Sequence, residues 1–128
     1  MKILGIGVDV IQNKRIQNLI NNKFFIKRTF GEREIKLSVK SKNKINYFAK
    51  RFAAKEAFAK SLGTGFRNNL NFKDIEILND KIGKPYYSKS KKINNIIIKK
   101  FKIKKYNLFL SISDERDYSV AFTILQTI

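Results

Sequence analysis

The stretch INYFAKRFAAKEAFAKSLGTG, residues 45–65, decides the fold, because it is the longest segment of helical character in the chain. Its apolar residues recur at helical spacing from Ile45 to Leu62. Gly63 and Gly65 then follow, and glycines are the usual residues just beyond the end of a helix. The pattern predicts one long helix from about Ile45 to Leu62, against which the other elements must pack.

This helix carries a glutamate whose role the spacing leaves open. Lys60 follows Glu56 by four residues, the ordinary helix-stabilising pair, which contributes about 0.2–0.5 kcal/mol. At about 100° per residue, however, Glu56 falls between Phe52 and Ala53, on the apolar face of the helix. A carboxylate there implies a cationic group that meets it. Spacing alone supports a surface ion pair and a ligand role equally.

The N-terminal stretch KILGIGVDVI, residues 2–11, alternates as a strand with two unlike faces. One face carries Leu4, Ile6, Val8 and Val10. The other is nearly bare at Gly5 and Gly7 and ends in Asp9. An unpaired charge in an apolar strand is costly. Asp9 therefore either marks the end of the strand or serves as an oxygen ligand, beside glycines that leave room for a bulky group.

The remaining pattern predicts a single α+β domain over residues 1–128, with an antiparallel sheet packed against one long helix and shorter helices. The expected elements are a helix at 14–20, a short extended piece from 24 leading into a helix at 31–38, a strand at 72–78, a short strand at 86–87, a helix at 89–102 and a β-hairpin at 106–125. Glu34 and most other acids lie among polar neighbours and are expected to be solvated.

The composition narrows the chemistry. The chain has 128 residues, a formal charge of +18, and neither cysteine nor histidine. Thiolate and imidazole ligands are therefore excluded, and any metal must be a hard ion such as Mg²⁺ held by carboxylates. Lysine outnumbers arginine 22 to 6, which indicates a broad compositional bias rather than a patch for nucleic acid. The partner or substrate is nevertheless expected to be acidic.

The N-terminal apolar run is short and is interrupted by Gly5, Gly7 and Asp9, so it is not read as a signal peptide. No apolar stretch approaches the roughly 20 residues that a membrane helix needs. We expect a cytoplasmic protein without a membrane partner.

Three motifs occur together and in order: GIGVDV at 5–10, RFAAKEAFAKSLGTG at 51–65, and GKP at 83–85 followed by LSISDERDYSVAF at 110–122. Together they resemble the holo-[acyl-carrier-protein] synthases, the short bacterial type of 4′-phosphopantetheinyl transferase, over essentially the whole chain. The resemblance implies Mg²⁺-dependent transfer of the phosphopantetheine arm from coenzyme A to a serine of apo acyl carrier protein, releasing adenosine 3′,5′-bisphosphate, in fatty acid biosynthesis. It also implies a homotrimer with shared active sites.

The resemblance also assigns residues. Asp9 and Glu56 correspond to the family's metal ligands, and this favours the ligand role for Glu56. Catalytic roles fall on Glu56, on Lys60 and, through the segment FGEREI, on Glu34 as an accessory acid. The residues expected at coenzyme A are Arg51, Lys60, Gly63, Thr64, Gly65, Lys84, Pro85 and Ser111. Lys55 of the K-E-A element has no settled role. Where some relatives have Ser-His, this chain has Ser113 and Asp114, so a histidine role there is in doubt.

The chemistry is consistent with these assignments. Attack by a serine hydroxyl on a pyrophosphate needs charge neutralisation, alignment and a proton acceptor. Without histidine, we expect water, positioned by the metal or by Glu34, to accept the proton. The acidic carrier protein would be received by basic residues around the first helix, namely Lys14, Arg15, Lys23, Lys27 and Arg28. The alternatives are a small basic nucleic-acid-binding module and a relative that binds coenzyme A without turnover.

Overall fold

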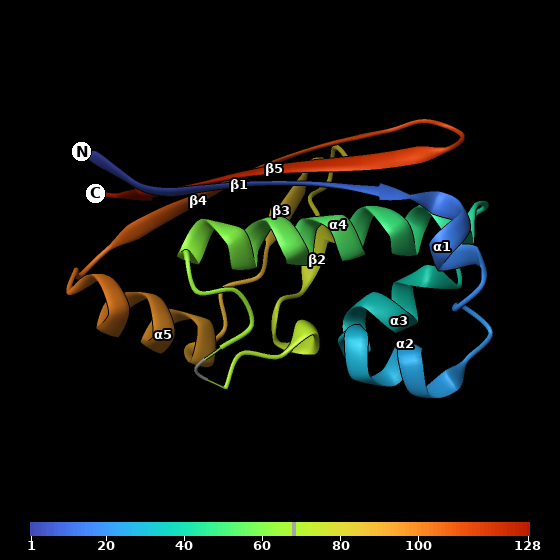
Figure 1. Cartoon of the computed structure of the whole chain (residues 1–128), viewed down its shortest axis with the longest axis horizontal. Helices are drawn as coiled ribbons and strands as arrows, with labels where there is room; N and C mark the ends of the chain where they lie inside the picture. Colours follow the sequence, from blue (N-terminus) through green and yellow to red (C-terminus); the bar gives the residue numbers. More distant parts are fainter. Residues whose placement is uncertain (68) are drawn as a thin grey trace.

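A three-stranded antiparallel sheet lies over one long helix in the computed structural model of the chain, which describes residues 1–67 and 69–128 (Figure 1). The strands are β1 (Lys2–Gln12), β4 (Tyr106–Asp114) and β5 (Tyr118–Thr127), and their order in the sheet is β1-β5-β4. β1 pairs with β5 so that Asp9 lies opposite Ala121. The predicted N-terminal strand, the C-terminal hairpin and the α+β class are confirmed.

The long helix α4 (Lys44–Leu62) is buried along most of its length. Asn43 caps its first turn by accepting a hydrogen bond from the backbone N–H of Asn46 at 3.1 Å. The helix ends at Gly63, whose φ of 79° is a left-handed conformation that glycine adopts without strain. The predicted helix and its stop signal are therefore confirmed.

The glycine face of β1 lies directly on α4. A Cβ atom at Gly7 would stand 1.8 Å from the carbonyl oxygen of Ala57, and one at Gly5 would stand 1.8 Å from that of Ser61. The expectation that these glycines leave room for a bulky group beside Asp9 is therefore wrong. The space is filled by the helix backbone, and the glycines allow strand and helix to approach closely enough to bring their side chains together.

The opposite face of the sheet is apolar and open. Ile6, Val8 and Val10 of β1 are 59%, 54% and 59% exposed, and Phe122 of β5 and Phe109 of β4 on the same face are 40% and 48% exposed. We call this surface the outer face. The buried core lies on the other side of the sheet, around α4 and the inward side chains of β5 such as Ala121 and Leu125.

The other elements pack around α4, several of them on its side away from the sheet (Figure 1). They are α1 (Asn13–Gln17), α2 (Lys23–Thr29), α3 (Glu32–Ser38), the 3₁₀ turn η1 (Phe72–Asp74), β2 (Ile77–Asn79), β3 (Pro85–Tyr87) and α5 (Lys91–Phe101). Two predictions were wrong: residues 23–29 form a helix rather than an extended piece, and residues 72–78 are mostly a turn, with β2 starting only at Ile77. Phe25 and Phe30 explain the first difference. Both are buried and meet edge to face at 6.0 Å, because the helix turns Phe25 inward and the chain becomes extended at Phe30, just beyond its end.

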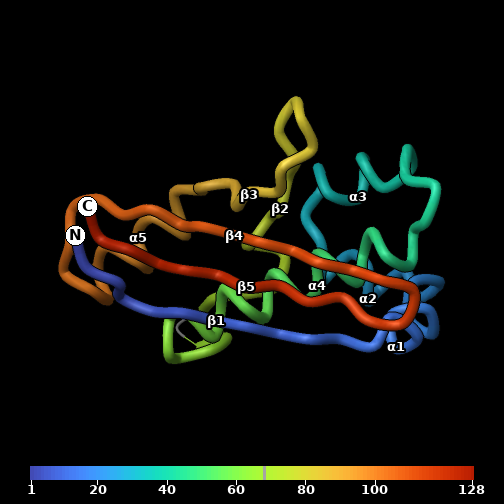
Figure 2. The backbone as a smooth tube through the Cα atoms, turned by 90° about the horizontal axis from the view of Figure 1, so that it is seen from above, coloured from blue at the N-terminus to red at the C-terminus, as the bar shows by residue number. Residues whose placement is uncertain are grey.

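Two loops lie at opposite edges of the sheet. Figure 2 shows the turn between β2 and β3 projecting beyond β4, while the chain that leaves α4 lies on the side of β1. Because α4 runs beneath the whole sheet, it contributes side chains to both edges. This arrangement separates the predicted site residues into groups.

Candidate active site

Asp9, Glu56 and Lys60 form the first group, where β1 crosses α4. The Nζ atom of Lys60 donates to Oδ1 of Asp9 at 3.2 Å and to the carbonyl oxygen of Val8 at 3.0 Å. The carboxylate of Asp9 is 17% exposed and the Lys60 side chain 54% exposed. Lys60 therefore pairs with the aspartate of the strand and not with Glu56, the pair that was one of the two interpretations of the helical spacing.

Glu56 lies one helical turn before Lys60, the residue that binds Asp9, so the three charges act on one another. Burial raises the pKa of the Glu56 carboxyl above 4.5, and repulsion from Asp9 raises it further, whereas Lys60 and Arg15 lower it. Two carboxylates that repel one another, beside one lysine, form a site that gains stability when a cation joins them. The position of Arg15 near Glu56 was not predicted in this role.

The acidic pair fits a magnesium ion. Among the described residues, no group of three or more carboxylates could hold a metal ion without help. Mg²⁺ does not require one, because it is commonly bound by one or two carboxylates together with substrate phosphates and water. Asp9 and Glu56 are hard oxygen donors of the right kind. The site is thus suited to a metal that arrives with a phosphate-bearing substrate.

The glycine turn follows this group at the end of α4. Gly63 and Gly65 have φ values of 79° and 65°, and a Cβ atom at either position would meet open space. Thr64 between them is half-buried. Backbone amides in such a turn can face an anion, and the turn begins three residues after Lys60. The structure therefore brings the glycine turn to the same end of α4 as the acidic pair.

A second group lies at the β4 edge, in a pocket of about 270 Å³. Arg51 and Pro85 line it, and Lys84 stands between its lining residues Gly83 and Pro85. The residues that complete the lining are Tyr47, Lys50, Ile77, Asn79, Ile112 and Asp114. The pocket forms where β2 and β3 pack beside β4 and α4. Arg51 of α4 therefore faces the turn that carries the GKP motif.

Ser111 belongs to neither group. It lies on β4 opposite Phe122, on the exposed outer face of the sheet. Its neighbour Ile112 points inward and lines the second pocket. The residues predicted to meet coenzyme A are therefore divided among the β1 edge, the β4 edge and the outer face.

Glu34 is not brought together with Asp9 and Glu56. Its side chain is fully buried, so the expectation that it is solvated is wrong. Oε1 accepts from Nζ of Lys55 at 2.6 Å and from the N–H of Gly31 at 3.0 Å, and Oε2 accepts from the N–H of Ile77 at 3.1 Å. Burial raises the pKa of Glu34 and lowers the pKa of Lys55, and the ion pair opposes both shifts.

Lys55, whose role the sequence analysis left open, is a buried structural residue. Its side chain is fully buried, and besides Glu34 its Nζ donates to the carbonyl oxygens of Phe72, at 3.1 Å, and Ile75. One ammonium thus joins α3, α4 and the segment before β2. One sequence feature could have indicated this role: Lys55 precedes Glu56 on the apolar side of the helix. A lysine that is buried there needs an acid as its partner.

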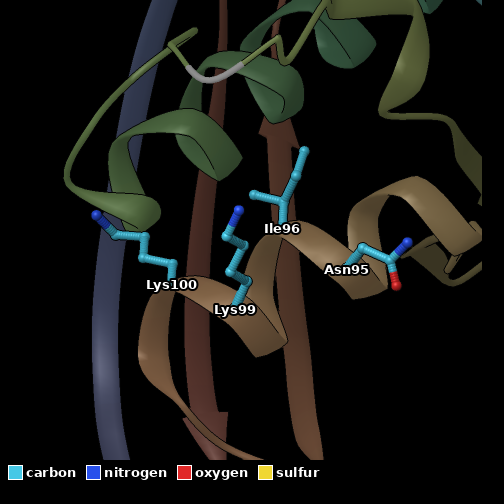
Figure 3. Close-up of a pocket in the computed structure, with 4 residues that line it drawn as sticks. All are labelled: Asn95, Ile96, Lys99 and Lys100. Carbon is cyan, nitrogen blue, oxygen red and sulfur yellow. The ribbon is translucent and has the colours of Figure 1, made fainter.

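A larger pocket, of about 450 Å³, lies beside α5 (Figure 3). Asn95, Ile96, Lys99 and Lys100 line it, and none of the four was predicted as part of a site.

Within the described part of the chain, no helix is long and apolar enough to cross a membrane.

The comparisons with known proteins agree with this geometry. Residues 5–123 match the 4′-phosphopantetheinyl transferase superfamily. A protein of Pelagibacter ubique named holo-[acyl-carrier-protein] synthase is 59% identical over 126 residues, which cover 98% of each chain. The crystal structure of holo-[acyl-carrier-protein] synthase from Neisseria meningitidis superposes with a TM-score of 0.85 at 36% identity, covering 98% of this chain and 100% of that one. The enzyme of Bacillus anthracis in complex with CoA (3′,5′-ADP) gives a TM-score of 0.80 at 34% identity, with 98% of both chains covered.

The fold and the matching residues thus define a transferase of the phosphopantetheinyl type. The chain belongs to the 4′-phosphopantetheinyl transferase superfamily and, within it, to the holo-[acyl-carrier-protein] synthases.

Proposed function

We propose that the protein transfers the 4′-phosphopantetheine arm from coenzyme A to a serine of apo acyl carrier protein, with Mg²⁺, and releases adenosine 3′,5′-bisphosphate. The observation that carries the proposal is the meeting of Asp9, Glu56 and Lys60 at the crossing of β1 and α4. Asp9 belongs to the GIGVDV motif and Glu56 to the KEA motif, 47 positions later, and Lys60 follows Glu56 by one helical turn. The reaction belongs to a cytoplasmic pathway of fatty acid synthesis.

In the proposed mechanism, Asp9 and Glu56 would hold the cation. When bound, Mg²⁺ supplies charge neutralisation and alignment of the pyrophosphate. Lys60, which pairs with Asp9 in this structure, would supply a positive charge for the phosphates of the leaving group. The side chain is 54% exposed, so it can move without displacing core packing.

The serine hydroxyl loses its proton to a water molecule near the acidic pair. The acidic pair would orient this water through its carboxylate oxygens. Glu34, which was expected to help position this water, is buried against Lys55 and is given no contact with the water in this mechanism. Through its bond to Lys55, one position before Glu56, it fixes the helix that carries the site.

Coenzyme A would occupy both edges of the sheet, and this requires more than one subunit. Lys60 and the glycine turn lie at the β1 edge, whereas Arg51, Lys84 and Pro85 lie at the β4 edge. A homotrimer would bring the β4 edge of one subunit to the β1 edge of the next, and Ser111 on the outer face would then join the site. The open apolar outer face supports this assembly, because a monomer rarely exposes so many large side chains on one face.

The carrier protein would dock on the basic surface of α1 and α2. Arg15 lies near Glu56, so a carrier bound there would deliver its serine to the acidic pair. Phe24, 81% exposed between Lys23 and the basic residues Lys27 and Arg28, adds an apolar contact. Electrostatic attraction would increase the association rate with an acidic carrier.

Mass spectrometry of apo acyl carrier protein, incubated with coenzyme A and Mg²⁺, tests the proposal. The carrier is expected to gain the mass of one phosphopantetheine arm. Asp9→Ala and Glu56→Ala should abolish this gain, whereas Asp117→Ala, which removes an exposed acid in the β4–β5 turn, should not. Binding of Mn²⁺ measured by electron paramagnetic resonance should be lost in the same two variants. Full transfer by either variant would refute the metal assignment.

A further inference from the structure

Arg51 is a buried cation without an acidic partner. The residue is 5% exposed, and among the described residues it forms no ion pair with a carboxylate. Asp114 lines the same pocket, but its Oδ2 accepts from Asn46 at 2.9 Å. A guanidinium stays protonated even where burial lowers its pKa. The pocket therefore holds a guanidinium that makes no direct ion pair with any carboxylate of the described residues.

Three contacts fix the orientation of this guanidinium. Its Cζ atom lies 3.6 Å from the centre of the Tyr47 ring, and Nη1 donates to the carbonyl oxygen of Tyr47 at 3.2 Å. Nη2 donates to the side-chain oxygen of Asn79 at 2.7 Å. Nε is buried and has no hydrogen-bond partner among the residues that the structure describes. The ring and the amide hold the group in place without supplying negative charge.

Asn79 also fixes the turn across the pocket. Its amide nitrogen donates to the carbonyl oxygen of Gly83 at 2.9 Å, and its backbone pairs with Pro85 in the β2–β3 ladder. Within that turn, Oδ1 of Asp80 accepts from the backbone N–H of Lys84 at 2.9 Å. One amide side chain thus connects Arg51 to the GKP segment.

We propose that Asn79 is a positioning residue for coenzyme A, and that it must be a neutral amide because it has to hold Arg51 without neutralising it. A carboxylate at this position would accept the same hydrogen bond as an ion pair and would give the charge a direct partner. It would also compete with an anionic ligand for the guanidinium. Asparagine thus keeps the charge available at the expense of stability. The inference rests on the proposed function, since it needs coenzyme A in this pocket.

Replacing Asn79 by aspartate should have opposite effects on the stability of the protein and on its affinity for coenzyme A. In Asn79→Asp, the dissociation constant for coenzyme A, measured by calorimetry, should rise about tenfold or more. The melting temperature should not fall below that of the control, because the new ion pair with Arg51 offsets the lost hydrogen bond to the carbonyl oxygen of Gly83. The salt dependence of coenzyme A binding should also weaken, because one charge of the pocket is already paired.

Asn95→Asp is the matched control, since it makes the same chemical change at an exposed residue of α5 that lines a different pocket. In Asn79→Ala, which removes the support but adds no charge, binding should weaken, stability should fall and the salt dependence should be kept. Unchanged affinity in Asn79→Asp would refute the inference, as would a loss of affinity accompanied by a matching loss of stability. If the wild-type protein fails to bind coenzyme A at all, the proposed function falls, and this inference with it.

Discussion

Replacement of Gly7 by alanine tests whether the contact between β1 and α4 builds the site. The added Cβ would lie 1.8 Å from the carbonyl oxygen of Ala57 and 2.9 Å from the backbone nitrogen of Ser61. Both neighbours are backbone atoms of a buried helix and cannot turn away. An ordinary contact begins at 3.4 Å, so strand and helix must separate by about 1.5 Å.

The separation has a cost in stability and a larger one in activity. Overpacking of a tight core costs about 1–3 kcal/mol, which corresponds to a fall of roughly 4–12 °C in melting temperature for a domain of this size. Asp9 lies two residues further along the same strand, and a misplacement of about 1 Å in an active site can reduce the rate about 100-fold. We therefore expect Gly7→Ala to lose most of its activity in carrier modification even below its melting temperature.

Gly83→Ala is a control for stability alone, because Gly83 also lines the second pocket. It makes the same chemical change where a Cβ meets open space, but at a φ of 88°, and should cost about 1–2 kcal/mol through backbone strain alone. Thermal unfolding and carrier modification, followed by mass spectrometry, give the two readouts. If Gly7→Ala keeps wild-type activity and unfolds no earlier than Gly83→Ala, the strand–helix contact does not set the geometry of the acidic pair.

Three further predictions concern charged groups. Glu56→Gln should abolish transfer but raise the melting temperature at neutral pH. The folded-state pKa of Glu56 lies above 4.5, so the ionised group destabilises the fold, and this penalty should vanish as the pH falls below 4.5; a lower melting temperature at pH 7 would contradict it. Lys55→Met should cost about 3–5 kcal/mol by leaving Glu34 buried without its partner, and denaturant unfolding should show that adding Glu34→Gln recovers part of the loss. Lys27→Glu should raise KM for an acidic carrier at low salt, with kcat for saturating carrier unchanged and the difference smaller in high salt; a KM equal to that of the wild type would remove α2 from the docking surface.

The parts of the fold that follow from local patterns were predictable from the sequence. The alternation of β1, the helical spacing of α4 and the glycines after Leu62 are local signals, and the structure confirms the elements that they predicted. The segment from Phe24 was predicted wrongly because its aromatic residues suit a strand as well as a helix. Contacts with the distant Phe52 at 6.3 Å, from Phe25 on α2, favour the helix, and no local pattern encodes them.

In the site, too, local patterns were predictable from the sequence and contacts between distant elements were not. Asp9 and Glu56 were singled out because each is a carboxylate on an otherwise apolar face. The direction of the glycine face could not be predicted, since alternation distinguishes two faces but does not say which one meets the helix. Nor could the partner of Lys60 be predicted, because Asp9 comes from another element. Asn79 carries no local signal, and its role becomes visible only when the strand and helix meet.

The pairing of β1 with β5 has a consequence for biosynthesis. Lys2 pairs with Thr127 and Asp9 with Ala121, so the first strand is held in the sheet by residues more than a hundred positions later. At a translation rate of about 5–20 residues per second, the N-terminal segment waits several seconds for its partner. During this time α4 can form from local contacts, but Asp9 has no strand to hold it against Glu56. The acidic pair is therefore completed only after the C-terminal strand has been made, and an incomplete nascent chain cannot assemble the site.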